Sequence, residues 1–423
     1  MKEDLSTKEQ GAQRVMIIGA GNFGCKVAER LSEQKKARFT ILACDTDQSD
    51  LESTEVPNRL LLEAEPKSVV SQIIKKSVDY LSSDLADITG EPFSTAFSVE
   101  PIRNLLTADI DVVIIVAGMG GKCGTEAVEK RIDDVRELAN AKDVAVVVGL
   151  GGEFGTEAAP VIAREAKAAG ASTVGVATLP FEHEGSVRVR RALDGLRELA
   201  VNCDAMFILN NESMLKYYGK LLVLDALVRI DNIMSDAADV LTTHCMRNEP
   251  QYKKLNAKVF GIGRAGADLV DYLREKKYRK TLLMTARVND DSGCIKSVEC
   301  NIDTGDVPTI LDVFSRFFSG KDSRACLVAD LGVSGIDTAT TMADLAKKNG
   351  AITIGLATLP AVSEGAAICT KAIDNLQKLA VKTDAVFAFR KDVCGESVSP
   401  FLGLMIEDIE YVVNRLIKEG KNQ

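Results

Sequence analysis

The sequence has no tryptophan, only two histidines (His183 and His244), and aromatic residues make up just 5% of its 423 positions. Two histidines leave little material for a histidine-based metal site or for a Ser-His-Asp catalytic triad. So few aromatic rings also argue against a surface that stacks nucleic-acid bases or anchors a protein partner. We therefore expect no metal site and no nucleic-acid partner.

The sequence also lacks an excess of positive charge and a long apolar run. It has 52 Lys and Arg against 61 Asp and Glu, for a formal net charge of -9. That balance argues against broad binding to nucleic acid or anionic lipid. No stretch approaches the roughly 20 apolar residues of a membrane-spanning helix. The polar N-terminal residues 1–14 do not resemble a signal peptide. We predict a flexible segment at 1–14 and a cytoplasmic protein without membrane insertion.

The ten cysteines form no Cys-x-x-Cys pair, so they give no sign of a metal or redox motif. Several lie within apolar runs, among them Cys44 and Cys326. Free cysteine behaves as a small hydrophobic residue and stays reduced in the cytoplasm. We therefore interpret the cysteines as buried thiols.

A glycine-rich turn follows the first apolar run of the chain. The turn is Gly19-Ala20-Gly21-Asn22-Phe23-Gly24, and a helical pattern comes directly after it. Glycines let a phosphate approach the backbone, and the N-terminus of the following helix favours an anion. Asp45 ends the next apolar run, about 20 residues later, where a ribose-binding carboxylate belongs in such folds. This pattern predicts the phosphate loop of an α/β nucleotide-binding domain.

Two more glycine-rich segments each follow an apolar run typical of a strand. One covers 118–124, and the other begins at Gly151, with a helix expected to start near Ala158. Ligands of open α/β sheets bind at the carboxyl ends of the strands. Three glycine loops at that edge predict a nucleotide site. The first loop and Asp45 would equally suit NAD, so an NAD-binding enzyme is an alternative.

The chain also repeats itself. The segment GASTVGVATLP at 170–180 returns as GAITIGLATLP at 350–360, an offset of 180 positions. The glycine turn at Gly19 returns at Gly261, an offset of 242, so the first copy holds 62 additional residues. We predict two tandem Rossmann-like α/β domains with mostly parallel sheets and helices on both faces. The first spans 15–247, with an insertion at about 49–110, and the second spans 258–423.

The order of motifs in the first copy resembles the GTPase domain of the FtsZ/tubulin family. The glycine turn at Gly19 and the segment Asp45-Thr46-Asp47 match the family's first loop and second strand end. The segment GGEFGTEAAPVIA at 151–163 resembles the family's GGGTGTG loop and its continuation. The segment TLPFEHEGSVR at 178–188 resembles a third family motif.

The resemblance implies a site for GTP or GDP and a part in a cytoskeletal polymer or in cell division, through self-association or a cytoskeletal partner. Its implied phosphate-binding residues are Gly19, Ala20, Gly21, Asn22, Phe23, Gly24, Gly120, Gly121, Lys122, Gly151, Gly152, Gly155 and Thr156. Its implied ribose- and base-binding residues are Asp45, Glu184, Arg188, Asn210, Asn211, Asp231 and Asn232. Glu184 and Arg188 are four positions apart, so a simple helix ion pair is an alternative for them.

The sequence departs from the family in ways that affect the chemistry. Glu153 and Glu157 stand where the family has glycine, and carboxylates beside a polyphosphate are unfavourable unless they point away or a cation such as Mg²⁺ offsets them. A different or less charged ligand is the alternative. In the second copy, Arg188 is replaced by Ile368 and Asn210 by Arg390. The segment 224–234 resembles the family's central helix, and the acidic loop that positions water in the family is not found after it. We therefore expect a second domain that binds no nucleotide, and slow or no hydrolysis in the first. A non-catalytic pseudo-dimeric scaffold is a further alternative.

Overall fold

The computed structural model describes the parts of the chain that form a sheet and most of its covering helices. The described residues are 15–20, 25–30, 39–45, 48–56, 58–61, 112–117, 143–150, 153–168, 172–218, 229–230, 232–234, 236–237, 258–275, 282–288, 295–300, 310–319, 324–332, 335–393, 402, 405–406 and 412. We call residues 15–237 the first half and residues 258–412 the second half.

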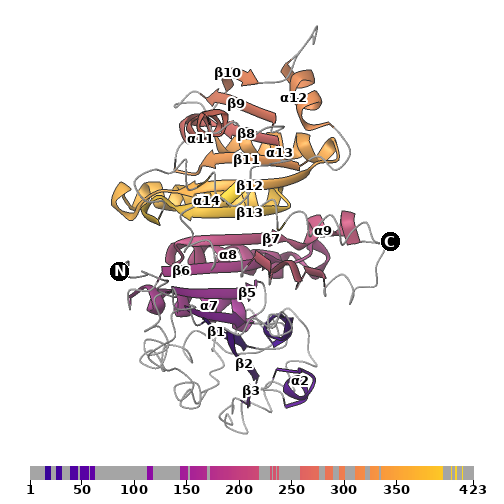
Figure 1. Cartoon of the computed structure of the whole chain (residues 1–423), viewed down its shortest axis with the longest axis vertical. Coiled ribbons are helices and arrows are strands. Elements are labelled where there is room, and N and C mark those ends of the chain that lie inside the picture. Colours follow the sequence, from indigo (N-terminus) through magenta and orange to yellow (C-terminus); the bar gives the residue numbers. More distant parts are fainter. Residues whose placement is uncertain are drawn as a thin grey trace, which may run out of the picture.

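A single sheet runs through both halves (Figure 1). The strands of the first half are β1 (Val15–Ala20), β2 (Phe39–Asp45), β3 (Asn58–Leu61), β4 (Val112–Ala117), β5 (Asp143–Gly149), β6 (Ser172–Leu179) and β7 (Ala205–Asn210). Those of the second half are β8 (Lys258–Ile262), β9 (Leu282–Val288), β10 (Ile295–Cys300), β11 (Arg324–Asp330), β12 (Ile352–Leu359) and β13 (Ala385–Arg390). The order is β10-β9-β8-β11-β12-β13-β7-β6-β5-β4-β1-β2-β3. The described pairs are parallel except β9 with β10 and β7 with β13. The predicted mostly parallel α/β fold is confirmed.

The strands are apolar because helices cover both faces of the sheet. In β7, Met206 and Ile208 belong to one buried cluster, while Ala205, Phe207 and Leu209 belong to the other. Side chains of successive strand residues point to opposite faces, so this alternation fills two cores at once. Both clusters contain residues of both halves, which means that the two halves share their hydrophobic cores.

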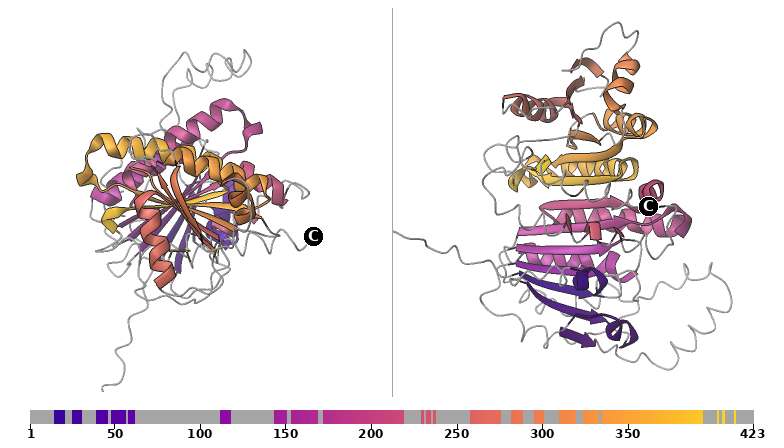
Figure 2. Two further views of the ribbon diagram at one scale, coloured as in Figure 1. Left: turned by 90° about the horizontal axis from the view of Figure 1, so that it is seen from above. Right: turned by 45° about the vertical axis from the view of Figure 1, so that its right-hand side comes forward.

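The helices lie around the twisted sheet in the view along its long axis (Figure 2). They are α2 (Gln48–Glu52), α7 (Glu153–Ala168), α8 (Ser186–Asn202), α9 (Asn211–Tyr218), α11 (Gly263–Glu275), α12 (Ile310–Phe318), α13 (Ile336–Lys348) and α14 (Ala366–Lys382), with short 3-10 turns η1 (Glu182–Glu184), η2 (Val362–Glu364) and η3 (Lys391–Val393). The first cluster is covered by α7, α8, α12, α13 and α14. The opposite face is covered by residues of 25–30, α9, 229–237 and α11.

The two halves join edge to edge at β7 and β13 (Figure 1). These antiparallel strands are paired so that Phe207 lies directly opposite Phe387, with ring centroids 4.7 Å apart. The two phenylalanines are 180 positions apart and therefore occupy equivalent positions in the two halves. The strand pair is thus centred on a pseudo-twofold axis that relates the halves. The sequence predicts two domains, and the structure joins them through one continuous sheet.

The repeated segments have the same elements in both halves. The unit β6-η1-α8-β7 returns as β12-η2-α14-β13, with every boundary displaced by 180 positions. The halves differ at β4, because β4 separates β1 from β5 whereas β8 pairs directly with β11. The strand β4 comes just after the stretch 49–110 that we assigned to the insertion. The difference between the halves therefore also includes this strand.

The described cysteine side chains agree with the expectation of buried thiols for three of four positions. Cys25, Cys203 and Cys326 are buried, and Cys369 is half-buried. Burial raises the pKa of Cys203 and of Cys326 to about 12, and the neighbouring Asp204 adds to the effect at Cys203. These two thiols remain protonated at neutral pH. In the described ranges, no helix is long and apolar enough to span a bilayer.

Candidate functional site

The carboxyl ends of five neighbouring strands meet at one edge of the first half. The registers pair Ala20 with Ala117, Gly149 with Thr178, and Leu179 with Asn210. Because β1, β4, β5, β6 and β7 are parallel, all the segments that follow them leave the sheet at this edge. With a strand spacing of about 4.8 Å, the edge from β1 to β7 is about 19 Å long. The structure thus gathers at one edge the strand ends that precede each glycine-rich segment.

The third of these segments differs from the expected loop. The helix α7 begins at Glu153, five residues before the start expected near Ala158, so Gly155 and Thr156 lie inside the helix. Thr156 is 4% exposed, and a Cβ at Gly195 of α8 would meet its Cγ2 at 2.2 Å. The Thr156 methyl group therefore packs against α8. Glu153 is the first residue of α7.

Glu184 and Arg188 face each other beyond the end of β6. The carboxylate Oε1 of Glu184 accepts the Phe181 N–H at 2.8 Å, and its Oε2 lies 3.0 Å from Arg188 Nε. The helix ion pair that we raised as an alternative is therefore present. The carboxylate also fastens the turn η1, which ends at Gly185 with φ 99°. A ribose contact of Glu184 stays a prediction.

Asn210 and Asn211 lie at the end of β7 and the start of α9, and both are buried. The Nδ2 of Asn210 donates to the Ala380 and Val381 carbonyls, at 3.3 and 3.0 Å, in the second half. Asn211 differs, because its Oδ1 is buried and accepts no hydrogen bond from the residues that the structure describes. A buried acceptor without a donor is costly, which makes Asn211 the stronger candidate for a ligand contact.

Some of the other predicted residues are described, and the rest lie outside the described ranges. Asn232 accepts a hydrogen bond from Arg30 Nη1 at 3.0 Å, which ties the central helix to the helix after the first glycine turn. Asp45 is the last residue of β2, at the same sheet edge. The predicted residues Gly21, Asn22, Phe23, Gly24, Gly120, Gly121, Lys122, Gly151, Gly152 and Asp231 lie outside the described residues.

The corresponding edge of the second half is occupied by its own charged side chains. Lys391, which stands where the first half has Asn211, lies 2.9 Å from Asp330 and 3.3 Å from Glu364. Both carboxylates raise the pKa of Lys391, although its partial burial opposes them. The Gly332 N–H donates to Asp330 Oδ1 at 3.1 Å. This loop N–H is therefore directed at a carboxylate of the chain itself.

The retained glycines of the second half have a packing role. A Cβ at Gly266 would lie 2.7 Å from the backbone of Gly261, so these two glycines let α11 approach β8 closely. A Cβ at Gly332 would lie 3.1 Å from Ile368, the residue in the position of Arg188. Strand-to-helix packing of this kind is one of the reasons for glycine in such turns. The glycine pattern in the second half thus needs no ligand to explain it.

Part of the chain matches the model of a known family. Residues 117–219 match the family described as Tubulin/FtsZ family, GTPase domain. This range runs from the end of β4 through α7, α8 and β7 to the end of α9. Over this range the chain is similar to the GTPase domain of the Tubulin/FtsZ family. The matched residues include the carboxyl ends of β4, β5, β6 and β7, with Glu184, Arg188, Asn210 and Asn211, whereas β1 lies outside the match.

Individual proteins are similar to the chain over a longer range than the family model. The chain is 28% identical over 231 residues to the cell division protein FtsZ of Aquifex aeolicus, covering 54% of this chain and 51% of the relative. It is 30% identical over 234 residues to FtsZ 1 of Pyrococcus abyssi, covering 55% and 51%. The chain spans about half the length of the curated relatives it matches. A solved FtsZ structure of M. jannaschii has 16% identity and a TM-score of 0.39, covering 90% of this chain and 84% of the other.

The first half is fixed to the second half by a reciprocal pair of side chains. Arg390, 180 positions after Asn210, is 4% exposed. It donates through Nε to the Cys203 carbonyl at 3.0 Å and through Nη2 to the Ala200 and Val201 carbonyls at 2.9 and 2.8 Å. Asn210 does the same to the equivalent carbonyls of α14. Each half therefore supplies the donors for the last turn of the other half's helix, where carbonyls lack partners.

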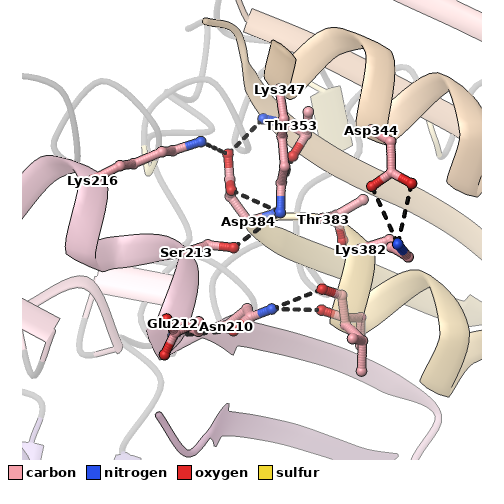
Figure 3. A network of polar contacts seen from close by, with 12 residues as sticks. Asn210, Glu212, Ser213, Lys216, Asp344, Lys347, Thr353, Lys382, Thr383 and Asp384 are labelled. Carbon is pink, nitrogen blue, oxygen red and sulfur yellow. Dashed lines mark hydrogen bonds and ion pairs between the residues drawn. The ribbon is translucent and has the colours of Figure 1, made fainter. Parts of the chain in front are cut away.

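A buried carboxylate adds to this junction (Figure 3). The side chain of Asp384 is 1% exposed and lies 2.7 Å from Lys216 Nζ and 3.3 Å from Lys347 Nζ. Burial lowers the pKa of Lys216, and the Asp384 carboxylate opposes this shift. Sequence reasoning missed the junction residues. The sequence offers one signal for the junction, which is that both copies have an aspartate at this position, Asp204 and Asp384. The change from Asn210 to Arg390 instead suggests that the second copy has lost a base-binding residue.

Proposed function

We propose that the first half binds a guanine nucleotide and hydrolyses GTP slowly or not at all. The match of residues 117–219 to a GTPase domain supports this proposal most directly. The phosphates would bind at the ends of β1, β4 and β5, where the glycine-rich segments leave the sheet. The base would bind near α9, where the Asn211 Oδ1 can accept from the N1–H and amino group of guanine.

The proposal assigns no nucleotide to the second half. Lys391 and Asp330 occupy the positions of Asn211 and Leu150, so charges of the chain replace groups that a ligand would meet. In addition, β8 pairs directly with β11, so the second half has no strand in the place of β4 at that edge. We infer from the shared elements and the common 180-residue offset that the halves arose by tandem duplication.

A cell-division or cytoskeletal role belongs to the same proposal. The relatives are called cell division protein FtsZ, and the sequence similarity to them covers about half of each protein. Slow turnover is proposed because the acidic loop that positions water in the family is not found after residues 224–234. Glu153 and Glu157 beside the proposed phosphates would also need an offsetting cation such as Mg²⁺. Any self-association of the chain would therefore depend more on binding of the nucleotide than on hydrolysis of GTP.

Binding of the full chain to labelled GTP, GDP, ATP and NAD, with and without Mg²⁺, tests the proposal. We expect a preference for GTP and GDP over ATP and NAD. Asn211→Leu should weaken GTP binding about tenfold, because a buried acceptor for the base is lost. The matched control is Lys391→Leu at the equivalent position of the second half, which should bind GTP as the unmodified chain does.

Three results would count against this assignment. A chain that binds no nucleotide would refute the proposal, and a preference for NAD would favour a dinucleotide enzyme. Equal GTP affinity of Asn211→Leu and the unmodified chain would show that the base lies elsewhere. Phosphate release from GTP, measured with the same samples, reports the expected slow turnover.

A further inference from the structure

A single short helix connects the proposed base-binding end of the site with the second half (Figure 3). The helix α9 starts at Asn211, whose buried Oδ1 accepts no hydrogen bond from the described residues. Glu212 accepts the Glu182 N–H at 2.9 Å, which joins the helix to the η1 turn. Ser213 Oγ accepts from Lys347 Nζ at 3.0 Å, and Lys216 Nζ lies 2.7 Å from Asp384 Oδ2. Both later contacts cross into the second half.

The anchor for this helix is Asp384, which several contacts hold in place. Asp384 is buried, and its Oδ2 also accepts the Thr353 N–H at 2.8 Å. The backbone carbonyl of Asp384 accepts the Asn210 N–H at 3.0 Å, one residue before α9. Hydrogen bonds from both sides thus fix Asp384 relative to the end of β7. A lysine bound to it is held in place together with its helix.

Lys216 is not needed simply to neutralise Asp384. Asp204, the equivalent residue in the first half, accepts the Thr173 N–H and has an ion pair with Lys167 at 2.6 Å. Lys347 is the equivalent of Lys167 and already supplies this charge to Asp384. Lys216 therefore adds a second cation, and it comes from α9.

The sequence does not repeat these two side chains at the equivalent positions of the second half. The residues 180 positions after Ser213 and Lys216 are Val393 and Glu396. Neither residue type can reproduce the contact, because valine has no hydroxyl and glutamate would repel the Asp204 carboxylate. The pair of Asp204 with Lys167 returns as Asp384 with Lys347, so the differences at Ser213 and Lys216 set the sequence of α9 apart from residues 391–398.

We propose that Lys216 and Ser213 are positioning residues, through which the second half holds α9 and sets the base preference of the nucleotide site. This inference rests on the function proposed above. The phosphate end would lie at β1, β4 and β5, and β5 is two strands, or about 10 Å, from β7. A loosened α9 should therefore affect recognition of the base and leave recognition of the phosphates intact.

The ratio of GTP to ATP affinity tests this inference, because the two ligands differ only in the base. Unlabelled GTP and ATP compete with labelled GTP for the full chain. Lys216→Met should lower the ratio about fivefold, a coupling at the low end of the usual range between sites. Ser213→Ala should lower it in the same direction, and Lys216→Arg should restore most of it.

The matched control is Lys382→Met. Lys382 forms an exposed ion pair with Asp344 at 3.1 Å within the second half, close to the same network. Its substitution should leave the ratio unchanged. Thermal unfolding of each variant identifies any general loss of structure, which would weaken GTP and ATP binding equally.

The outcomes separate this inference from the proposed function. If the unmodified chain binds no GTP, or has no preference for GTP over ATP, both are wrong. If it prefers GTP and the Lys216→Met and Ser213→Ala variants keep the same ratio, the positioning role is wrong while the proposed function stands. Equal weakening of GTP and ATP by Lys216→Met would also overturn it, since α9 would then act on the fold alone.

Discussion

Arg390 offers a direct measurement of how strongly the two halves are joined. Its guanidinium group donates to three carbonyls at the end of α8, and it is buried at the pseudo-symmetric position of Asn210. Arg390→Met removes these donors while keeping an unbranched side chain. Arg390→Asn places at this position the residue that its own counterpart uses, and Asn210 reaches two equivalent carbonyls.

The expected magnitude follows from the contacts. Hydrogen bonds from a charged donor are worth about 1.5–3 kcal/mol each, but methionine also avoids the cost of burying a guanidinium, which is several kcal/mol. We therefore expect Arg390→Met to lower the free energy of unfolding by about 2–4 kcal/mol. Asparagine can restore two neutral hydrogen bonds at about 1 kcal/mol each, so Arg390→Asn should recover about half of that loss.

Urea unfolding followed by far-ultraviolet circular dichroism suits this chain, which has no tryptophan. Arg197→Met is the control at the same junction, because Arg197 and Asp374 form a contact in which both side chains are more than 40% exposed. It should cost less than about 1 kcal/mol. The reasoning fails if Arg390→Met is as stable as the unmodified chain, or if Arg390→Asn is no better than Arg390→Met.

Two more predictions concern packing and pH. Gly195→Ala should destabilise the first half by about 1–3 kcal/mol, because the new Cβ would meet Thr156 Cγ2 at 2.2 Å. Adding Thr156→Ser, which removes this methyl group, should recover part of the lost stability. Thermal unfolding measures both variants, and equal stability of the single and double variants would contradict the clash. The pKa of Lys391 is raised above 10.5 in the folded chain, so its stabilisation is complete below that pH and is lost as pH rises through the folded-state value. The difference in unfolding free energy between the unmodified chain and Lys391→Met should be constant to about pH 10 and shrink above it, and a difference that grew with pH would show the opposite shift.

Several parts of the fold could be predicted because they depend on local sequence. The strands β4 and β5 consist largely of valine and isoleucine between turn signals, and the 180-residue repeat fixed equivalent elements in both halves. The start of α7 was placed too late. Glycine at 155 suggested a loop, but the burial of Thr156 against Gly195 extends the helix to Glu153.

The junction could not be predicted, since its contacts join residues far apart in the chain. Asn210 looked like a base-binding residue, yet its amide donates to Ala380 and Val381, 170 and 171 residues away. Arg390 looked like a lost ligand contact, and it instead completes α8. Local patterns do not report which sheet edge meets which.

The sequence by itself determined the α/β elements, the repeat and the family resemblance, because strand and helix periodicity, glycine turns and motif order are local properties. Only the tertiary structure decided that β7 and β13 pair into one sheet, that Lys391 occupies the second edge, and that α9 is tied to Asp384. These features depend on which surfaces meet once both halves have folded, and on the need to satisfy buried donors and acceptors there.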